Sequence, residues 1–201
     1  MTLPARPTSV DSQFWDARFG EPGYAYGENP NDFLRLACQQ IVPGEALSLC
    51  EGEGRNAVYL AKLGFRVTAA DFSEVGLAKT KALAASQAVE ITTMLIDLAD
   101  LELGVARWDL VVSIFAQPPA ATRQRLFRQL AQGLRPNGGF ILEAKVEANS
   151  GPAGRYPGAA VLREEIAPLT LTMEDEQERQ LNEGRYHASV QRTVRILAFN
   201  R

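Results

Sequence analysis

The residues of this sequence that are best suited by type and spacing to bind a ligand lie in one short run, residues 51–56 (EGEGRN). Gly52 and Gly54 let a backbone approach a ligand closely, because glycine carries no side chain. Asp71 follows after the next apolar segment, where a carboxylate can accept hydrogen bonds from ribose hydroxyls. This combination predicts a nucleotide-binding turn and leaves open which nucleotide it holds.

The segments on either side of the turn are those that would position it. Residues 46–50 (ALSLC) are short and mostly apolar, which is typical of a strand covered on both faces, and residues 65–70 form a second such strand. Between them, residues 56–63 carry apolar side chains at helical spacing. The order strand, turn, helix, strand predicts a βαβ unit that delivers Asp71 to the rim of a sheet.

Strands and helices continue to alternate along the chain, which predicts a parallel sheet with right-handed crossovers. The further strands are expected at residues 91–96, 108–115 and 140–146, the helices at 74–87 (capped by Ser73) and 119–134, and a turn at 135–139. A loop at 147–160 and a helix at 161–169 come next. The last two strands, 171–181 and 186–199, flank Asn182-Glu183-Gly184, which indicates an antiparallel hairpin.

The N-terminal part differs in composition from the rest. Residues 1–13 are expected to be disordered, and residues 14–45 to form a helical lid that includes a helix capped by Asn31 or Asp32. Aromatic side chains are concentrated in residues 14–26, where they either pack the edge of the domain or cover the ligand. The expected division is one domain, residues 1–201, with the lid followed by a ligand-binding βα core at 46–146 and a loop, helix and hairpin at 147–201.

Composition narrows the class of protein. The 201 residues are 46% hydrophobic and 22% charged, as in an ordinary globular protein, and the net charge of −3 offers no attraction for nucleic acid or an anionic membrane. Cys38 and Cys50 lack metal-site spacing, so we expect reduced thiols and no bound metal. No apolar run approaches the ~20 residues of a membrane span, and residues 1–10 lack the apolar core of a signal peptide. These features predict a cytoplasmic protein without nucleic-acid or membrane partners; its oligomeric state stays open.

The turn alone does not identify the nucleotide. Residues 52–57 (GEGRNA) satisfy the loose dinucleotide pattern G-x-G-x-x-A. Asp97, however, ends the third strand, where it could accept hydrogen bonds from an adenine amino group, and a hairpin ends the sheet. The sequence also lacks a Tyr-x-x-x-Lys pair for hydride chemistry. These features disfavour a nicotinamide dinucleotide.

Over residues 14–200 the chain resembles the class I S-adenosylmethionine-dependent methyltransferases. Residues 26–34 (YGENPNDFL), 51–65 (EGEGRNAVYLAKLGF) and 134–142 (LRPNGGFIL) are similar to the tellurite-resistance/thiopurine methyltransferase-like group. The resemblance implies an α/β, Rossmann-like fold: a mostly parallel seven-stranded sheet with helices on both faces and a C-terminal antiparallel hairpin. It also implies S-adenosylmethionine as the cofactor.

The resemblance assigns roles to the residues at the matching positions. The residues that would wrap the methionine part of the cofactor are Glu51, Gly52, Glu53, Gly54, Arg55 and Asn56. Asp71 would accept hydrogen bonds from the ribose hydroxyls, Phe72 and Ser73 would lie beside the adenine, and Asp97 and Leu98 would hold the other edge of the adenine. Ser113 and Phe115 would form the floor of the cavity near the sulfonium, and Tyr26 would close its N-terminal side.

Two positions depart from the family pattern. Ser48 and Cys50 stand where many members carry an acidic residue and a glycine. We therefore expect Glu51 or Glu53 to brace the loop in place of the missing carboxylate, and the backbone at Cys50 to be unstrained.

The activity implied by the resemblance is in-line methyl transfer to a small molecule, for which the protein chiefly supplies alignment. A soft sulfur, selenium or tellurium nucleophile would need no dedicated base, whereas a nitrogen or oxygen nucleophile often would. No catalytic residue is identified, and Gln117, Tyr156 and His187 (expected early in the last strand) are candidates for the acceptor pocket. Two alternatives stay open: a non-catalytic S-adenosylmethionine-binding module and a nicotinamide-dependent oxidoreductase.

Overall fold

A computed structural model describes residues 12–146 and 156–201 of the chain. The expectations for residues 1–11 and 147–155 lie outside the described residues. Residues 12 and 13 belong to a helix, α1 (Ser12–Phe19), so the expected disorder is wrong at these two positions.

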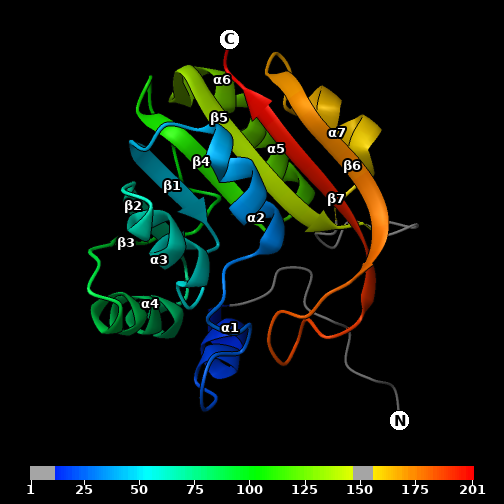
Figure 1. Ribbon diagram of the computed structural model, residues 1–201. Coiled ribbons are helices and arrows are strands. Elements are labelled where there is room, and N and C mark those ends of the chain that lie inside the picture. The colour runs from blue at the N-terminus through cyan, green and yellow to red at the C-terminus, as the bar shows by residue number, and fades with distance from the viewer. Residues whose placement is uncertain (1–11, 147–155) are drawn as a thin grey trace.

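The centre of the fold is a seven-stranded sheet with the order β3-β2-β1-β4-β5-β7-β6 (Figure 1). The strands are β1 (Glu45–Leu49), β2 (Arg66–Asp71), β3 (Thr92–Leu95), β4 (Trp108–Ile114), β5 (Leu134–Lys145), β6 (Thr170–Gln180) and β7 (Val190–Phe199). The pairs from β3 to β5 are parallel, and β7 runs antiparallel to both β5 and β6. The expected mostly parallel sheet with an antiparallel C-terminal hairpin is confirmed.

Helices cover both faces of the sheet, and each face has its own hydrophobic core. One core packs side chains from α2 (Asp32–Ala37), α3 (Arg55–Lys62) and α4 (Glu74–Ser86) on the sheet, and η1 (Cys38–Gln40) extends α2. The other core uses α5 (Ala120–Arg128), α6 (Leu130–Gly133) and α7 (Ala159–Glu165). Figure 1 shows α2 in front of β4 and β5, with α5 behind them. Because both faces are buried at the centre of the sheet, β1, β2 and β4 read as mostly apolar runs without alternation.

The two capping predictions are confirmed. The Asn31 side chain accepts a hydrogen bond from the Leu34 N–H at the start of α2, and Ser73 accepts one from the Gly76 N–H at the start of α4. These caps fix where each helix leaves the preceding loop. Since Ser73 follows β2 directly, its cap also fixes the exit of the strand that carries Asp71.

Two expected local structures around residues 119–139 differ from the prediction. The helix expected at residues 119–134 is divided into α5 and α6, and the turn expected at 135–139 is part of β5. Asn137 has a φ of +65°, and the register between β4 and β5 shifts beside it, so the turn residues form an irregular stretch of strand instead of ending it.

The connection between β6 and β7 is also wider than the expected tight hairpin. The Leu181 N–H donates to the Ser189 carbonyl and the Glu183 N–H to the His187 carbonyl, which closes a loop over residues 181–189. His187 therefore lies in this loop and not in the last strand. The loop reaches the N-terminal segment, where the Arg185 N–H donates to the Ala25 carbonyl at 2.9 Å.

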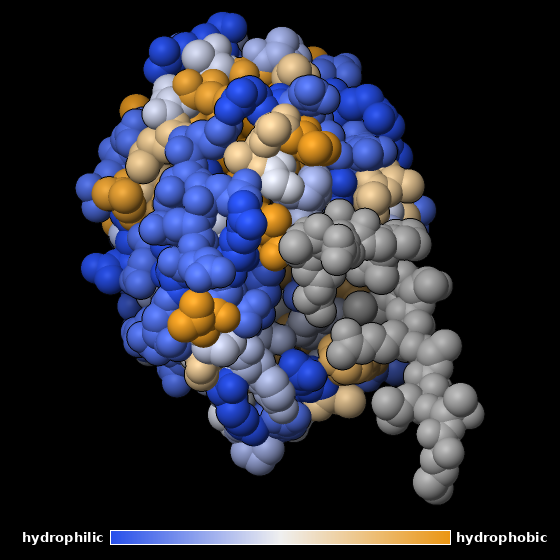
Figure 2. All heavy atoms as spheres, turned by 90° about the vertical axis from the view of Figure 1, so that its right-hand side faces the viewer, coloured by the Kyte–Doolittle hydropathy of each residue, from blue (hydrophilic) through white to orange (hydrophobic). Residues whose placement is uncertain are grey.

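Strand β6 forms one edge of the sheet and is rich in acidic residues, including Glu174, Asp175 and Glu178. Charged side chains along an edge disfavour the addition of another strand. The molecule is seen from this side in Figure 2, and the coloured part of that face is largely hydrophilic, with apolar residues in small groups. Of the helices in the described ranges, none is both long and apolar enough to cross a membrane.

Candidate functional site

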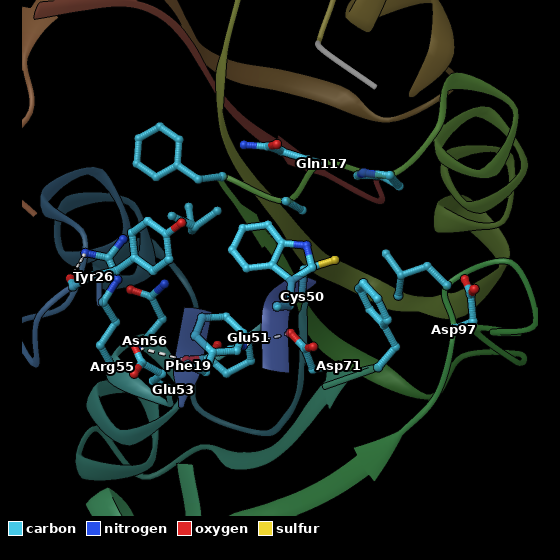
Figure 3. A pocket seen from close by; sticks show the side chains of 18 of the residues that line it. Phe19, Tyr26, Cys50, Glu51, Glu53, Arg55, Asn56, Asp71, Asp97 and Gln117 are labelled. Carbon is cyan, nitrogen blue, oxygen red and sulfur yellow. Dashed lines mark hydrogen bonds between the residues drawn. The ribbon is translucent and has the colours of Figure 1, made fainter. Parts of the chain in front are cut away.

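A cavity of about 340 Å³ lies at the carboxyl ends of the parallel strands (Figure 3). Its wall includes residues that follow β1, β2, β3 and β4, together with part of the N-terminal segment and His187 of the 181–189 loop. Its volume falls within the range of about 300–1,000 Å³ for small-molecule sites. In open α/β sheets, ligands bind outside the carboxyl ends of the strands, and this cavity has that position.

Most of the residues singled out from sequence line this cavity. Those on its wall are Tyr26, Glu51, Gly52, Glu53, Arg55, Asn56, Asp71, Phe72, Asp97, Leu98, Phe115, Gln117 and His187. Figure 3 shows Asp97 on one side of the cavity, with Tyr26 and Arg55 on the opposite side. The fold thus brings together acidic strand ends and an N-terminal aromatic residue that are far apart in the sequence.

Glu51 braces the glycine turn. Its Oε1 accepts hydrogen bonds from the Asn56 and Ala57 N–H groups at 3.0 and 2.9 Å, and its Oε2 accepts one from the Ser48 hydroxyl. Burial raises the pKa of the Glu51 carboxyl above its ordinary value, against the effect of these donors. The expectation that a glutamate compensates for Ser48 is confirmed. Glu51 satisfies the first N–H groups of α3 and connects the turn to β1.

Asp71 fixes the other side of the turn. Its Oδ2 accepts from the Gly52 N–H at 2.9 Å and its Oδ1 from the Ser73 N–H at 2.8 Å. Burial raises the pKa of this carboxyl above its ordinary value, and the two N–H donors oppose that effect. Each carboxylate oxygen keeps a second lone pair, and the residue lines the cavity. Asp71 can therefore accept hydrogen bonds from a ligand while it holds the turn.

Two cavity residues adopt an unusual backbone conformation. Cys50, which follows β1, has a φ of +50°, and Phe115, which follows β4, has a φ of +51°. The left-handed region is unfavourable for residues other than glycine, so the expectation of an unstrained Cys50 is wrong. The physical reason is the direction of the chain, which must turn sharply out of the strand where glycine would be the easier residue. Burial, with the nearby Asp71 carboxylate, raises the pKa of the Cys50 thiol and keeps it neutral.

The N-terminal segment is held onto the turn by polar contacts. Glu53 accepts from the Ala25 N–H at 2.7 Å and from Lys79 Nζ at 2.9 Å. Lys79 also donates to the Gly23 carbonyl at 2.6 Å. On α1, the Asp16 carboxylate accepts a hydrogen bond from the Ser73 hydroxyl at 2.5 Å. Residues 14–26 therefore pack against the glycine turn, and Trp15, Phe19 and Tyr26 line the cavity, whereas α2 packs on the sheet.

Phe19 explains why two glycines are needed below α1, and sequence reasoning did not identify this packing. A Cβ atom built on Gly52 would lie 2.9 Å from Phe19 Cζ, and one built on Gly76 would lie 2.9 Å from Phe19 Cδ2. Gly52 also has a φ of +67°. Both glycines thus make room for the Phe19 ring, which is buried and lines the cavity.

Aromatic side chains continue from Phe19 along the cavity wall. Trp15 stacks on Phe19 with ring centroids 5.3 Å apart, and Phe19 lies 6.4 Å from Tyr26. Tyr26 and Phe115 each have ring centroids 4.6 Å from that of His187. This aromatic row, defined as Trp15, Phe19, Tyr26, His187 and Phe115, gives the cavity a largely apolar wall. Of its members, Trp15 and Phe19 were predicted only as part of an aromatic segment.

Four residues predicted for the site do not line the cavity: Gly54, Ser73, Ser113 and Tyr156. Gly54 has a φ of +97°, and a Cβ atom there would meet the Thr80 backbone at 2.8 Å, so this glycine serves helix packing. Ser73 is fully buried as a helix cap.

Ser113 and Tyr156 lie in the core beneath the cavity. The Ser113 and Tyr156 hydroxyl oxygens are 3.3 Å apart, and both residues are buried. The Arg123 guanidinium lies 5.2 Å from the centre of the Tyr156 ring, and burial raises the pKa of the phenol. Tyr156 was expected in a loop, as a candidate for the acceptor pocket. It instead fills the hydrophobic core that covers the second face of the sheet.

A buried charge cluster supports the cavity wall from behind. Glu183, in the 181–189 loop, accepts from Arg55 Nη2 at 2.6 Å, Arg179 Nη2 at 3.1 Å and Asn31 Nδ2 at 2.9 Å. Burial opposes ionisation of Glu183, but the His187 and Arg55 side chains outweigh it and hold the carboxyl pKa at about 2. Glu183 is therefore ionised at neutral pH, and it fixes Arg55 at the cavity.

Glu143 on β5 continues this cluster. It is fully buried and accepts from Asn31 Nδ2 at 2.7 Å, Arg179 Nε at 2.9 Å and Arg195 Nε at 3.1 Å. Neither Glu143 nor its partners follow a motif that the sequence alone would reveal. Among residues 12–146 and 156–201, no group of three or more His, Cys, Asp or Glu side chains is arranged to hold a metal ion.

Part of the sequence and the whole fold are similar to those of known proteins. Residues 46–138 match a family model described as a methyltransferase domain. A solved structure from work on the conversion of a disulfide bond into a thioacetal group during echinomycin biosynthesis has a TM-score of 0.73 and 17% identity, over 94% of this chain and 91% of that one. TehB from Haemophilus influenzae has a TM-score of 0.72 and 18% identity, over 94% of this chain and 67% of that one.

A third structure is that of the N-methyltransferase NodS from Bradyrhizobium japonicum in complex with S-adenosylhomocysteine. It has a TM-score of 0.69 and 16% identity, over 94% of this chain and 97% of that one. The search of curated proteins found no match. At these identities the solved structures show the fold, which is the Rossmann-like methyltransferase fold, and residues 46–138 match the model of a methyltransferase domain.

Proposed function

We infer that this chain, whose residues 46–138 match the model of a methyltransferase domain, is a methyltransferase that uses S-adenosylmethionine to methylate a small molecule. The observation that carries the proposal is the cavity at the carboxyl ends of β1 to β4, most of whose wall lies within the matched region and which is bounded by Gly52, Asp71 and Asp97. Gly52 follows β1, Asp71 ends β2 and Asp97 follows β3.

The cavity residues fit S-adenosylmethionine on several points of chemistry. Asp71 offers a carboxylate to the ribose hydroxyls. Asp97 follows the neighbouring strand β3 and lines the same cavity, a position from which its carboxylate could accept a hydrogen bond from the adenine amino group. Glu53 and Arg55 place opposite charges on the wall, which suits the ammonium and carboxylate of an amino acid. Glu51 is engaged in hydrogen bonds within the turn, so its task is to hold the turn.

The protein's own residues do little covalent chemistry in this proposal. When bound, S-adenosylmethionine supplies a methyl group on a sulfonium, so the transfer depends on alignment of the acceptor. The aromatic row gives the cavity an apolar side and offers ring faces, which attract cations. A cavity of this volume, with apolar and polar sides, supports a small acceptor.

For the acceptor we propose a soft nucleophile, a sulfur compound first and a selenium or tellurium compound second. The support is the apolar aromatic wall together with the likeness of three sequence segments to the tellurite-resistance/thiopurine methyltransferase-like group. A structure of TehB is among the similar solved structures. Soft nucleophiles tolerate an apolar cavity better than strongly hydrated amines do.

The net charge of −3 supports a further proposal, that nucleic acid and membranes are not partners. Cys38 and Cys50 are free thiols, which supports a cytoplasmic location.

The experiment is a screen with S-adenosylmethionine labelled in its methyl group, using aryl and alkyl thiols, selenite, tellurite and small amines as acceptors. We expect label in a thioether or in methylated selenium or tellurium, and none in the amines. Label only in the amines would contradict the soft-nucleophile proposal. Saturable cofactor binding without transfer to any acceptor would favour the non-catalytic binding module.

A further inference from the structure

His187 is the only histidine of the chain, and its surroundings are those of a proton acceptor. The residue is 5% exposed and lines the cavity. Its ring lies between Tyr26 and Phe115, with centroid distances of 4.6 Å to each. Two aromatic neighbours fix the plane of the imidazole without offering either nitrogen a strong hydrogen bond.

The two ring nitrogens have different environments. Nδ1 is buried, has no hydrogen-bond partner among the described residues, and lies 3.8 Å from Glu183 Oε2. Glu183 is held in place by Arg55 Nη2 at 2.6 Å. A nitrogen lone pair aimed at a carboxylate would be repelled, so Nδ1 is the nitrogen that carries the hydrogen of the neutral ring. Nε2, on the opposite side of the ring from Nδ1, then keeps its lone pair.

We infer that His187 is the general base of this site: Nε2 accepts the proton of an acceptor that reaches the cavity as an un-ionised thiol, and Glu183 is the positioning residue that holds the ring and stabilises its charged form. This inference rests on the proposed function and extends it from ionised to protonated soft nucleophiles. Lys145 is a further charged group that acts on the ring beside Arg55 and Glu183, and the Tyr26 phenol packs against the imidazole.

The acceptor S–H bond breaks, its proton passes to Nε2, and its electron pair stays on sulfur. That sulfur forms a bond to the methyl carbon as the bond from this carbon to the sulfonium breaks, leaving the electron pair on the departing sulfur. The products are a methyl thioether, S-adenosylhomocysteine and a protonated His187, which returns its proton to solvent. A carboxylate behind a histidine supports such a transfer by orienting the ring and stabilising the imidazolium.

The charge state of the resting ring agrees with this role. Burial lowers the pKa of His187 below its ordinary value of 6.5; Glu183 opposes the change, and Lys145 and Arg55 add to it. The ring is therefore neutral at pH 7 and able to accept a proton. A protonated ring would instead have to lose a proton before each turnover.

Because the chain has one histidine, its two ring nitrogens can be followed directly by ¹⁵N NMR of protein labelled at histidine, saturated with S-adenosylhomocysteine. We expect a neutral ring at pH 7 with a protonated Nδ1 and an unprotonated Nε2, and a titration midpoint below 6.5. A protonated Nε2 with a bare Nδ1, or a charged ring at pH 7, would overturn the inference. Calorimetry on the same samples tests the proposed function separately, since that proposal fails if S-adenosylhomocysteine does not bind.

Methyl transfer supplies the second arm, with two thiols that differ in ionisation. Phenylmethanethiol keeps its proton at neutral pH, as a free cysteine does with a pKa of about 8.5, whereas 4-nitrothiophenol is ionised. We expect His187→Gln to lower kcat for phenylmethanethiol by about 10²-fold or more, the range for a lost general base, and to change kcat for 4-nitrothiophenol little.

A structural role would give a different pattern. His187→Asn keeps an N–H donor near the position of Nδ1 and has no acceptor at the position of Nε2, so the inference predicts that it does not restore transfer to phenylmethanethiol. Recovery of that transfer in His187→Asn, or equal losses for the two thiols in His187→Gln, would overturn the inference. Tyr186→Phe is the matched control in the same loop, because the Tyr186 hydroxyl bonds Glu21 at the surface; circular dichroism of each variant verifies folding.

Discussion

Replacement of Asp71 by asparagine tests the carboxylate that the fold places at the end of β2. The substitution keeps the size of the side chain and removes its charge. In the folded protein the carboxylate accepts from the Gly52 N–H at 2.9 Å and from the Ser73 N–H at 2.8 Å, and it lines the cavity. Asparagine offers one oxygen acceptor, so one of these two N–H groups loses its partner.

Two separate losses follow from this geometry. The orphaned buried N–H should lower the free energy of unfolding of the ligand-free protein by about 1–3 kcal/mol. The lost bond between ribose hydroxyl and carboxylate should weaken S-adenosylmethionine binding by about 1.5–3 kcal/mol, or about 10- to 150-fold in Kd. The first loss is measured by urea unfolding without ligand and the second by isothermal titration calorimetry well below the unfolding transition.

The control removes the same charge outside the cavity. Asp100 is exposed and does not line the cavity, so Asp100→Asn should leave both quantities within error of the wild type. An Asp71→Asn protein that is folded and binds S-adenosylmethionine with a Kd within about twofold of the wild type would refute the ribose role, since a twofold change is worth only about 0.4 kcal/mol.

Three further predictions concern the packing and charge of the site. Phe19→Ala should lower the free energy of unfolding by about 3–5 kcal/mol, because the ring fills the space above Gly52; an unchanged melting temperature would contradict that packing. Glu143→Gln should lower the free energy of unfolding in urea by about 3–5 kcal/mol, because it removes the buried carboxylate that pairs with both Arg179 and Arg195, and a cost under about 1 kcal/mol would match a surface pair instead. Glu183 has a pKa of about 2 in the folded protein against an ordinary value of 4.5, so as pH falls the unfolded chain takes up a proton at Glu183 before the folded protein does. The ionised carboxylate therefore stabilises the folded protein by about 3 kcal/mol above pH 4.5, and this contribution is lost as pH falls towards 2. Urea unfolding between pH 6 and pH 3 should show this decline in the wild type and a shallower one in Glu183→Gln; parallel profiles would count against it.

Much of the fold could be predicted from local patterns. The apolar runs at 46–50 and 65–70 are strands because both sides of the sheet are buried, and a run of that kind is visible without knowledge of its neighbours. The caps at Asn31 and Ser73 were equally visible, since each side chain bonds an N–H three residues along the chain. The acidic residues Asp71 and Asp97 could be placed at the cavity because parallel strands bring their carboxyl ends to one edge.

The features that could not be predicted depend on contacts between distant parts of the chain. Asn31 bonds Glu143 across 112 residues, and no local pattern marks either residue as a partner of the other. His187 was expected in a strand because the tight-turn signal at residues 182–184 is local, whereas the loop is shaped by its contact with Ala25. Tyr156 looked like a loop residue, but its ring fills the hydrophobic core between the sheet and helices α5, α6 and α7, a core whose residues come from distant parts of the sequence.

Cys50 shows a limit of another kind. The usual glycine at this position implies a special backbone conformation, and the presence of a cysteine suggested that the requirement had been removed. The chain instead keeps the conformation, with a φ of +50°, and accepts the strain. The chain needs a sharp exit from β1 to form the cavity. The residue type at position 50 does not reveal whether the backbone conformation has changed to suit cysteine or cysteine has been accepted in the strained conformation.

The most direct test of the central claim is a calorimetric titration of the purified protein with S-adenosylhomocysteine, S-adenosylmethionine and NADH, repeated with Asp71→Asn. Our account predicts saturable binding of the two adenosyl-sulfur compounds, weakened in the variant, and no heat from NADH beyond dilution. Binding of NADH, or no binding of either adenosyl-sulfur compound, would contradict it.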